Sequence, residues 1–142
     1  MACSRAPEPR TRIFTSTSLE RMARARIPDD VGRDAVDLAV REAASRDEIA
    51  TAVRYTLQLL AERSNGNTLE VRVPPFGAVQ CIEGPRHTRG TPPNVIETDA
   101  ETWLALATGA LTWAEAASSP TVTASGQRAD LTGHIPVLRL PH

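Results

Sequence analysis

The segment 98–126 constrains the fold more than any other, because residues that start and stop helices divide it into short elements. Thr98 and Glu101 have the spacing of a capping box, in which each side chain binds the other residue's backbone N–H. A helical apolar pattern follows, and Gly109 can end a helix in the left-handed conformation without steric cost. We therefore expect a short helix that begins after Thr98 and ends before Gly109.

The remainder of this segment predicts a second helix and a strand. Thr112 and Glu115 repeat the capping-box spacing before a short helix at 113–118. Proline then blocks continuation of the helix, and 121–125 has the pattern of a strand. Residues 127–131 are expected to form a last helical turn. A helix–helix–strand unit needs a sheet to pack against, so the preceding chain must supply further strands.

Two longer helices are expected upstream, at 31–44 and 46–63. Apolar residues recur at helical spacing in both ranges. Ser45 and Glu48 form another capping box at the start of the second helix. This is the clearest helix signal in the sequence.

Three strands are expected between these helices and the 98–126 unit, at 68–73, 76–82 and 94–97. The first alternates strictly between apolar and polar residues, as a half-buried strand does. The element order lacks the regular alternation of strand and helix that a doubly wound sheet requires. We therefore predict an α+β fold, in which helices cover one face of a mainly antiparallel mixed sheet.

One folded domain is the natural expectation for 142 residues. Residues 1–27 carry six Arg against two acidic residues and show no sustained period, so we expect a disordered basic leader. The domain is expected over 28–133, and 134–142, with two prolines, is expected to be a tail that trails over the surface. Met22 is a candidate for the true start, in which case 1–21 comes from an over-extended gene prediction.

Composition argues against several classes of function. The net charge of −1 gives no basic bias toward nucleic acid. Cys3 and Cys81 lack metal-ligand spacing, and free thiols fit a reducing cytoplasm. No apolar run reaches the roughly 18 residues of a membrane-spanning helix, so we expect no stable membrane insertion. No cofactor is predicted, and the oligomeric state is left open.

No enzyme is predicted, because the sequence contains no serine-hydrolase elbow, phosphate-binding loop, dinucleotide fingerprint or zinc-protease motif. A reaction would need a base from His87, or a carboxylate such as Glu83 or Glu97, and the spacing demands neither. Cys81 could be a reactive thiol, but its strand position favours a buried one.

Positive charge gathers in the loop 84–93, which contains Arg86, His87 and Arg89 among glycines, prolines and threonines. Guanidinium groups and exposed backbone N–H groups could bind an anion or a protein partner there. The simpler alternative is a rigid connection whose turns are set by the prolines and glycines.

Both tryptophans, Trp103 and Trp113, lie in the 98–126 segment, on different short helices. Core packing is the simpler role for each, since a large aromatic ring is stabilised by burial. The functional alternative is that one or both line an apolar cavity between the helices and the sheet.

The pattern of Asp99–Gly109, a short alanine-rich helix and a strand ending at Gly126 resembles the sterol carrier protein family. The segments 71–81 and 84–94 are further similar to a compact bacterial branch of that family. The resemblance covers roughly residues 24–133. It implies an α+β fold with an apolar tunnel for lipid-like ligands, non-covalent binding and no turnover.

The expected function is therefore a non-catalytic carrier of a lipid or other apolar small molecule, held between sheet and helices. The alternative is an accessory or protein-interaction module that binds an anion or a partner through the loop of Arg86, His87 and Arg89. The candidate ligand-binding residues comprise these three together with apolar side chains of the expected strands and helices. The apolar candidates are Val71, Val73, Phe76, Trp103, Leu104, Leu106 and Trp113.

Overall fold

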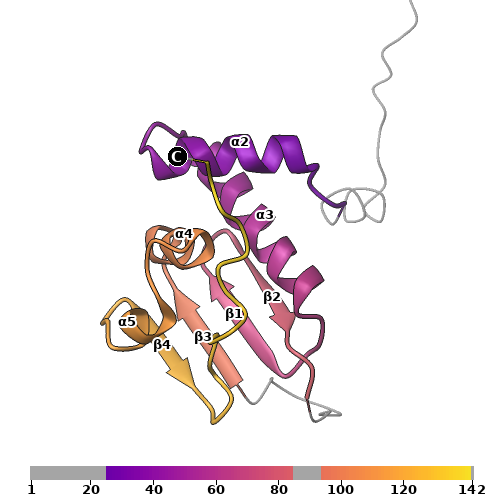
Figure 1. The fold of residues 1–142 in the computed structure, drawn as a ribbon, viewed down its shortest axis with the longest axis vertical. Coiled ribbons are helices and arrows are strands. Elements are labelled where there is room, and N and C mark those ends of the chain that lie inside the picture. The colour runs from indigo at the N-terminus through magenta and orange to yellow at the C-terminus, as the bar shows by residue number, and fades with distance from the viewer. Residues whose placement is uncertain (1–24, 85–93, 142) are drawn as a thin grey trace, which may run out of the picture.

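The structure, a computed structural model, describes residues 25–84 and 94–141. Within these residues, four helices pack against a four-stranded sheet, which confirms the predicted α+β class (Figure 1). The elements are α2 (Asp29–Val40), α3 (Arg46–Arg63), β1 (Leu69–Val73), β2 (Gly77–Cys81), β3 (Asn94–Thr98), α4 (Ala100–Thr108), α5 (Trp113–Ala117) and β4 (Val122–Ser125).

The sheet is mixed, and its strand order is β2-β1-β3-β4. The two outer pairs, β2 with β1 and β4 with β3, are antiparallel, whereas the central pair of β1 and β3 is parallel. The prediction of a mainly antiparallel mixed sheet is therefore confirmed. The parallel pair places β3 on the opposite side of β1 from the hairpin partner β2.

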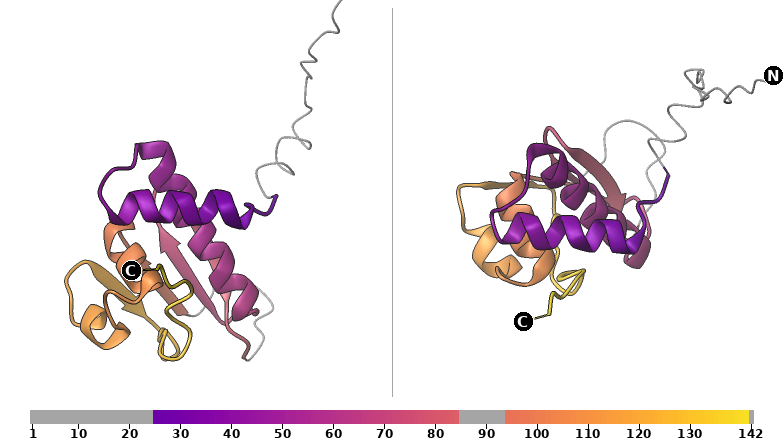
Figure 2. Two further views of the ribbon diagram at one scale, coloured as in Figure 1. Left: turned by 45° about the horizontal axis from the view of Figure 1, so that its top comes forward. Right: turned by 90° about the horizontal axis from the view of Figure 1, so that it is seen from above.

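Helices α3 and α4 cover one face of the sheet, as Figures 1 and 2 show from three directions. Leu69, Val71 and Val73 of β1 point into this covered face and are fully buried. Glu70 and Arg72 alternate with them on the opposite face, where they form an ion pair with a 2.7 Å N–O distance. The strict alternation in the sequence thus identified both faces of the central strand.

Helix α3 begins at the predicted capping box. The Ser45 hydroxyl accepts a hydrogen bond from the Glu48 N–H at 3.2 Å, and the Glu48 carboxylate accepts one from the Ser45 N–H at 2.8 Å. Leu57 and Leu60 of this helix are buried in the core. The predicted range of 46–63 is confirmed.

Helix α2 crosses α3 and ends earlier than predicted (Figure 2). Gly32 lies against the Tyr55 ring, and a Cβ atom at this position would overlap the ring. Glycine is therefore required for the close approach of the two helices. The predicted end at residue 44 is wrong, because Glu42 has a positive φ of 60°, which the helix cannot include.

Two further local predictions are corrected at the sheet edge. Asp99, not Thr98, caps α4, since its carboxylate accepts a 2.7 Å hydrogen bond from the Thr102 N–H. Thr98 is the last residue of β3, and its hydroxyl donates to the Thr121 carbonyl at 2.9 Å. Residues 127–131 form a turn and extended chain and not a helical turn.

The expectation that the chain trails over the surface after residue 134 is also wrong. Val137 and Leu138 are each only 5% exposed. Their backbone N–H groups both donate to the Ala107 carbonyl, at 2.9 and 3.1 Å. The Arg63 side chain donates to the Val137 carbonyl at 3.0 Å, so α3 and α4 together hold this segment in place.

Candidate functional site

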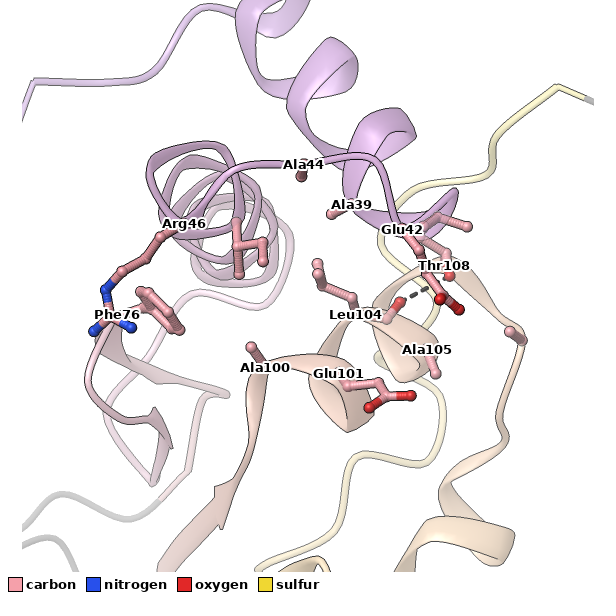
Figure 3. Close-up of a pocket in the computed structure, with 13 residues that line it drawn as sticks. Ala39, Glu42, Ala44, Arg46, Phe76, Ala100, Glu101, Leu104, Ala105 and Thr108 are labelled. Atoms are coloured by element: carbon pink, nitrogen blue, oxygen red, sulfur yellow. Dashed lines mark hydrogen bonds between the residues drawn. The ribbon is translucent and has the colours of Figure 1, made fainter.

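The candidate site is a pocket of about 750 Å³ between helices α2, α3 and α4 (Figure 3). It is bounded by the end of α2, the loop into α3, the first turns of α3, the outer side of α4 and the turn between β1 and β2. Pockets that hold small molecules commonly have volumes of roughly 300–1,000 Å³. The lining residues are Ala39, Val40, Glu42, Ala44, Arg46, Ile49, Phe76, Ala100, Glu101, Leu104, Ala105, Thr108 and Ala110.

Most of the pocket wall is apolar, and much of it consists of alanine. Ile49, Phe76 and Leu104 supply the larger apolar side chains. Val40, another lining residue, is 46% exposed, which is unusual for a large hydrophobic side chain on this protein. The pocket therefore offers apolar surface that the fold itself leaves uncovered.

Four lining residues are polar, and they differ in what they already contact. The Thr108 hydroxyl donates to the Leu104 carbonyl at 2.8 Å, one turn earlier in α4. The Arg46 guanidinium lies over the Phe76 ring, 5.3 Å from its centroid. Glu42 and Glu101 are exposed, and within residues 25–84 and 94–141 neither carboxylate forms an ion pair. The two carboxylates are thus available to a ligand.

The structure brings two of the predicted ligand-binding residues to this pocket, Phe76 and Leu104. Val71, Val73 and Leu106 instead lie in the packed core with no exposed surface. The pocket is therefore bounded by helices, and it meets the sheet region only through Phe76 in the β1–β2 turn.

The two tryptophans occupy different environments. Trp103 is fully buried, and its indole N–H donates to the Thr56 hydroxyl at 2.8 Å. That hydroxyl in turn donates to carbonyls of the preceding turn of α3. Trp113 of α5 is half-buried against the core. Neither lines the pocket, and Trp103 joins α4 to α3 through a satisfied polar contact.

The predicted anion loop cannot be placed beside the pocket. Arg86, His87 and Arg89 lie outside the described residues. Their role in binding an anion or a partner stays a prediction.

Sequence reasoning missed most of the pocket, including Glu42, Arg46 and Glu101. A usable signal was the number of alanines on α2, α4 and the loops that follow these helices, since small side chains leave space where helices meet. Periodicity alone treats such alanines as ordinary helix formers. The position of the pocket depends on how three helices cross, which the sequence pattern does not specify.

The Cys81 thiol is fully buried, and burial raises its pKa to about 12. It is therefore protonated and unreactive at neutral pH, as its strand position suggested. In the described part of the chain, no group of three or more His, Cys, Asp or Glu side chains could hold a metal ion. No helix there has both the length and the apolar character needed to cross a membrane.

A mixed sheet covered by helices, with a largely apolar pocket beside it, defines a small α+β domain. A family model described as bacterial SCP ortholog matches residues 45–137, more than half of the 142-residue chain. The chain therefore belongs to the bacterial family of sterol carrier protein orthologues, as the sequence resemblance indicated. A comparison with curated proteins gives no significant match.

Proposed function

We propose that the protein is a non-catalytic carrier that binds an apolar or amphipathic small molecule in the pocket between α2, α3 and α4. The observation that carries this proposal is the cavity of about 750 Å³ with a largely apolar wall. Membership of the sterol carrier family supports the same class of ligand. We also propose a cytoplasmic location, which would keep the Cys81 thiol reduced.

The size of the side chains in the wall suggests how such a ligand is held. Ala39, Ala100 and Ala105 leave room that Ile49, Phe76 and Leu104 partly fill. An apolar molecule in this space removes both its own surface and theirs from water, which is favourable by roughly 25 cal/mol per Å². No covalent step is needed for this kind of binding.

The test is titration with N-phenyl-1-naphthylamine, an uncharged apolar dye whose fluorescence rises in apolar surroundings. We expect saturable binding to the unmodified protein. Ala105→Phe should abolish or strongly weaken it, because a phenyl ring would occupy the space beside Leu104. Displacement by lipids of differing chain length would then rank the natural candidates.

Ala114→Phe is the matched control, since Ala114 is an exposed residue of α5 that does not line the pocket. It adds the same ring and should leave dye binding unchanged. A folded protein that shows no saturable response to the dye, or an Ala105→Phe variant that binds it as well as the control, would exclude the pocket as the binding site.

A further inference from the structure

We infer that the pocket selects amphiphiles with a positively charged headgroup, such as long-chain amines, over neutral and anionic molecules with the same tail. This inference rests on the proposed carrier function and specifies its ligand class. It is drawn from the arrangement of charge around an apolar cavity: Glu42 and Glu101 lie on one side of the pocket, and Arg46 lies on the other (Figure 3).

The charged lining residues favour a cation. Two carboxylates and one guanidinium line the pocket, which gives these residues a net charge of −1. Neighbouring groups do not reverse this balance. Arg41 lies next to Glu42 in the chain, but it is paired with Asp37 at 3.1 Å. Glu48, near the start of α3, is engaged in the capping box with Ser45.

Arg46 is less available to an anion than the carboxylates are to a cation. Its guanidinium lies over the Phe76 ring, where the negative face of the aromatic ring stabilises the positive charge. An anionic headgroup would have to compete with this contact. Glu42 and Glu101 make no ion pair within the described ranges 25–84 and 94–141, so binding a cation there displaces only water.

The exposure of both carboxylates determines the orientation in which such a ligand would bind. Glu42 and Glu101 are exposed, whereas Leu104, which also lines the pocket, is 6% exposed. The headgroup would therefore stay at the rim in contact with water, and the tail would enter the apolar interior. This arrangement avoids the large cost of burying a charged group.

The test is to measure, by calorimetric titration at neutral pH, the affinity of three ligands with the same ten-carbon tail: decylamine, decanol and decanoate. Each ligand is kept below its aggregation concentration. We expect decylamine to bind about five- to tenfold more tightly than decanol, the scale of two solvent-exposed charge contacts. Decanoate should bind no more tightly than decanol. Added salt should reduce the preference for the amine, because exposed charges are screened.

The double variant Glu42→Gln with Glu101→Gln should remove the preference for decylamine while decanol still binds. Glu97→Gln is the control, because Glu97 is an exposed carboxylate of β3 that does not line the pocket. The Glu97→Gln variant makes the same chemical change outside the pocket and should still bind decylamine more tightly than decanol. Arg46→Gln should increase the preference, since it removes the opposing charge.

The outcomes separate this inference from the carrier function. Saturable binding of all three ligands without a preference for decylamine, or a preference for decanoate, would overturn the charge selectivity and leave the carrier function intact. A preference that persists in the double variant would also overturn it. If none of the three ligands binds, the carrier proposal itself fails, and the inference fails with it.

Discussion

Helix α4 carries apolar residues on two sides, of which one packs into the core and the other lines the pocket. Trp103, Leu106 and Ala107 face inward and have no exposed surface. Leu104 and Ala105 adjoin them in the sequence but line the pocket. The spacing of three or four residues from Trp103 to Leu106 and Ala107 places the inward set along one side of the helix.

The comparison shows that a helix can carry apolar residues on two sides for two separate reasons. One side completes the core, and the other faces a space that the fold does not fill. An apolar helix is usually taken to be buried on every side. In α4 the second apolar side lines a pocket, so we expect Leu104 to contribute less to stability than a fully enclosed core residue, although it is only 6% exposed.

The largest expected effect comes from shortening one leucine on each side of α4. Leu106→Ala should lower the free energy of unfolding by about 2–5 kcal/mol, because it leaves an enclosed cavity in the core. Leu104→Ala should cost at least about 1 kcal/mol less, since it enlarges a pocket that is already open. Urea unfolding followed by tryptophan fluorescence measures both values. Equal losses would show that the two sides are not distinct.

A somewhat smaller effect is expected where the first turn of α2 packs against Tyr55 of α3. Gly32→Ala should lower the free energy of unfolding by about 1–3 kcal/mol, because the new methyl group would overlap the buried Tyr55 ring. This steric cost should exceed the gain of up to about 1 kcal/mol that alanine brings to a helix. The same substitution should alter dye binding, because moving α2 reshapes the pocket.

Gly77→Ala is the matched control for this change. A methyl group there would approach Leu57 at 3.5 Å, which is an ordinary contact distance. We expect little loss of stability and unchanged dye binding. If both alanine variants behave alike in thermal unfolding, close packing at Gly32 does not set the position of α2.

A pH-dependent effect is expected at the start of α2, where Asp29 also contacts Tyr55. The Tyr55 hydroxyl donates a 2.7 Å hydrogen bond to the Asp29 carboxylate, and this bond together with Arg26 lowers the Asp29 pKa from 3.8. A lowered pKa in the folded state stabilises the protein above about pH 4, and this contribution is lost as the pH falls through the folded pKa. Tyr55→Phe should therefore reduce the melting temperature at pH 5–7 and have a smaller effect below about pH 4.

Melting curves between pH 2.5 and 7 test this prediction. Some acid sensitivity should remain in the variant, because hydrogen bonds from Thr112 and Thr132 lower the pKa values of Glu115 and Asp130. A constant difference between variant and unmodified protein over the whole pH range would show that the Tyr55–Asp29 bond is not the cause.

The smallest expected effect on stability is at the predicted anion loop. Arg86→Ala combined with Arg89→Ala should change the melting temperature little and should leave dye binding in the pocket intact. If the loop binds an anion, the variant loses phosphate binding measured by calorimetry. Unfolding of the double variant would instead favour the alternative of a rigid structural connection.

Much of the local structure follows from the sequence, because it depends on residues close together in the chain. The Ser45–Glu48 and Thr112–Glu115 capping boxes form as predicted. The Thr98–Glu101 box does not, because Thr98 is used by the sheet and the adjacent Asp99 provides a better cap. The capping-box spacing alone could not show which of the two adjacent residues, Thr98 or Asp99, would cap the helix.

The pocket and the packing of residues 134–141 depend on contacts between distant segments. Gly32 lets α2 pack against Tyr55, and the left-handed Glu42 that follows the end of α2 lines the pocket together with residues of α4. The two prolines after residue 134 suggested an exposed tail. The segment is instead held against the core, because the side chains of Val137 and Leu138 are buried and their backbone N–H groups donate to the Ala107 carbonyl.

The hydrogen bonds from the Val137 and Leu138 N–H groups to the Ala107 carbonyl have a consequence for folding during synthesis. These core residues lie far along the sequence from α3, whose Arg63 donates a hydrogen bond to the Val137 carbonyl. During synthesis, α3 and the β1–β2 hairpin emerge well before the segment that completes their cover. The core is therefore closed only after residue 138 has emerged, and until then the nascent domain exposes apolar surface that is prone to aggregation.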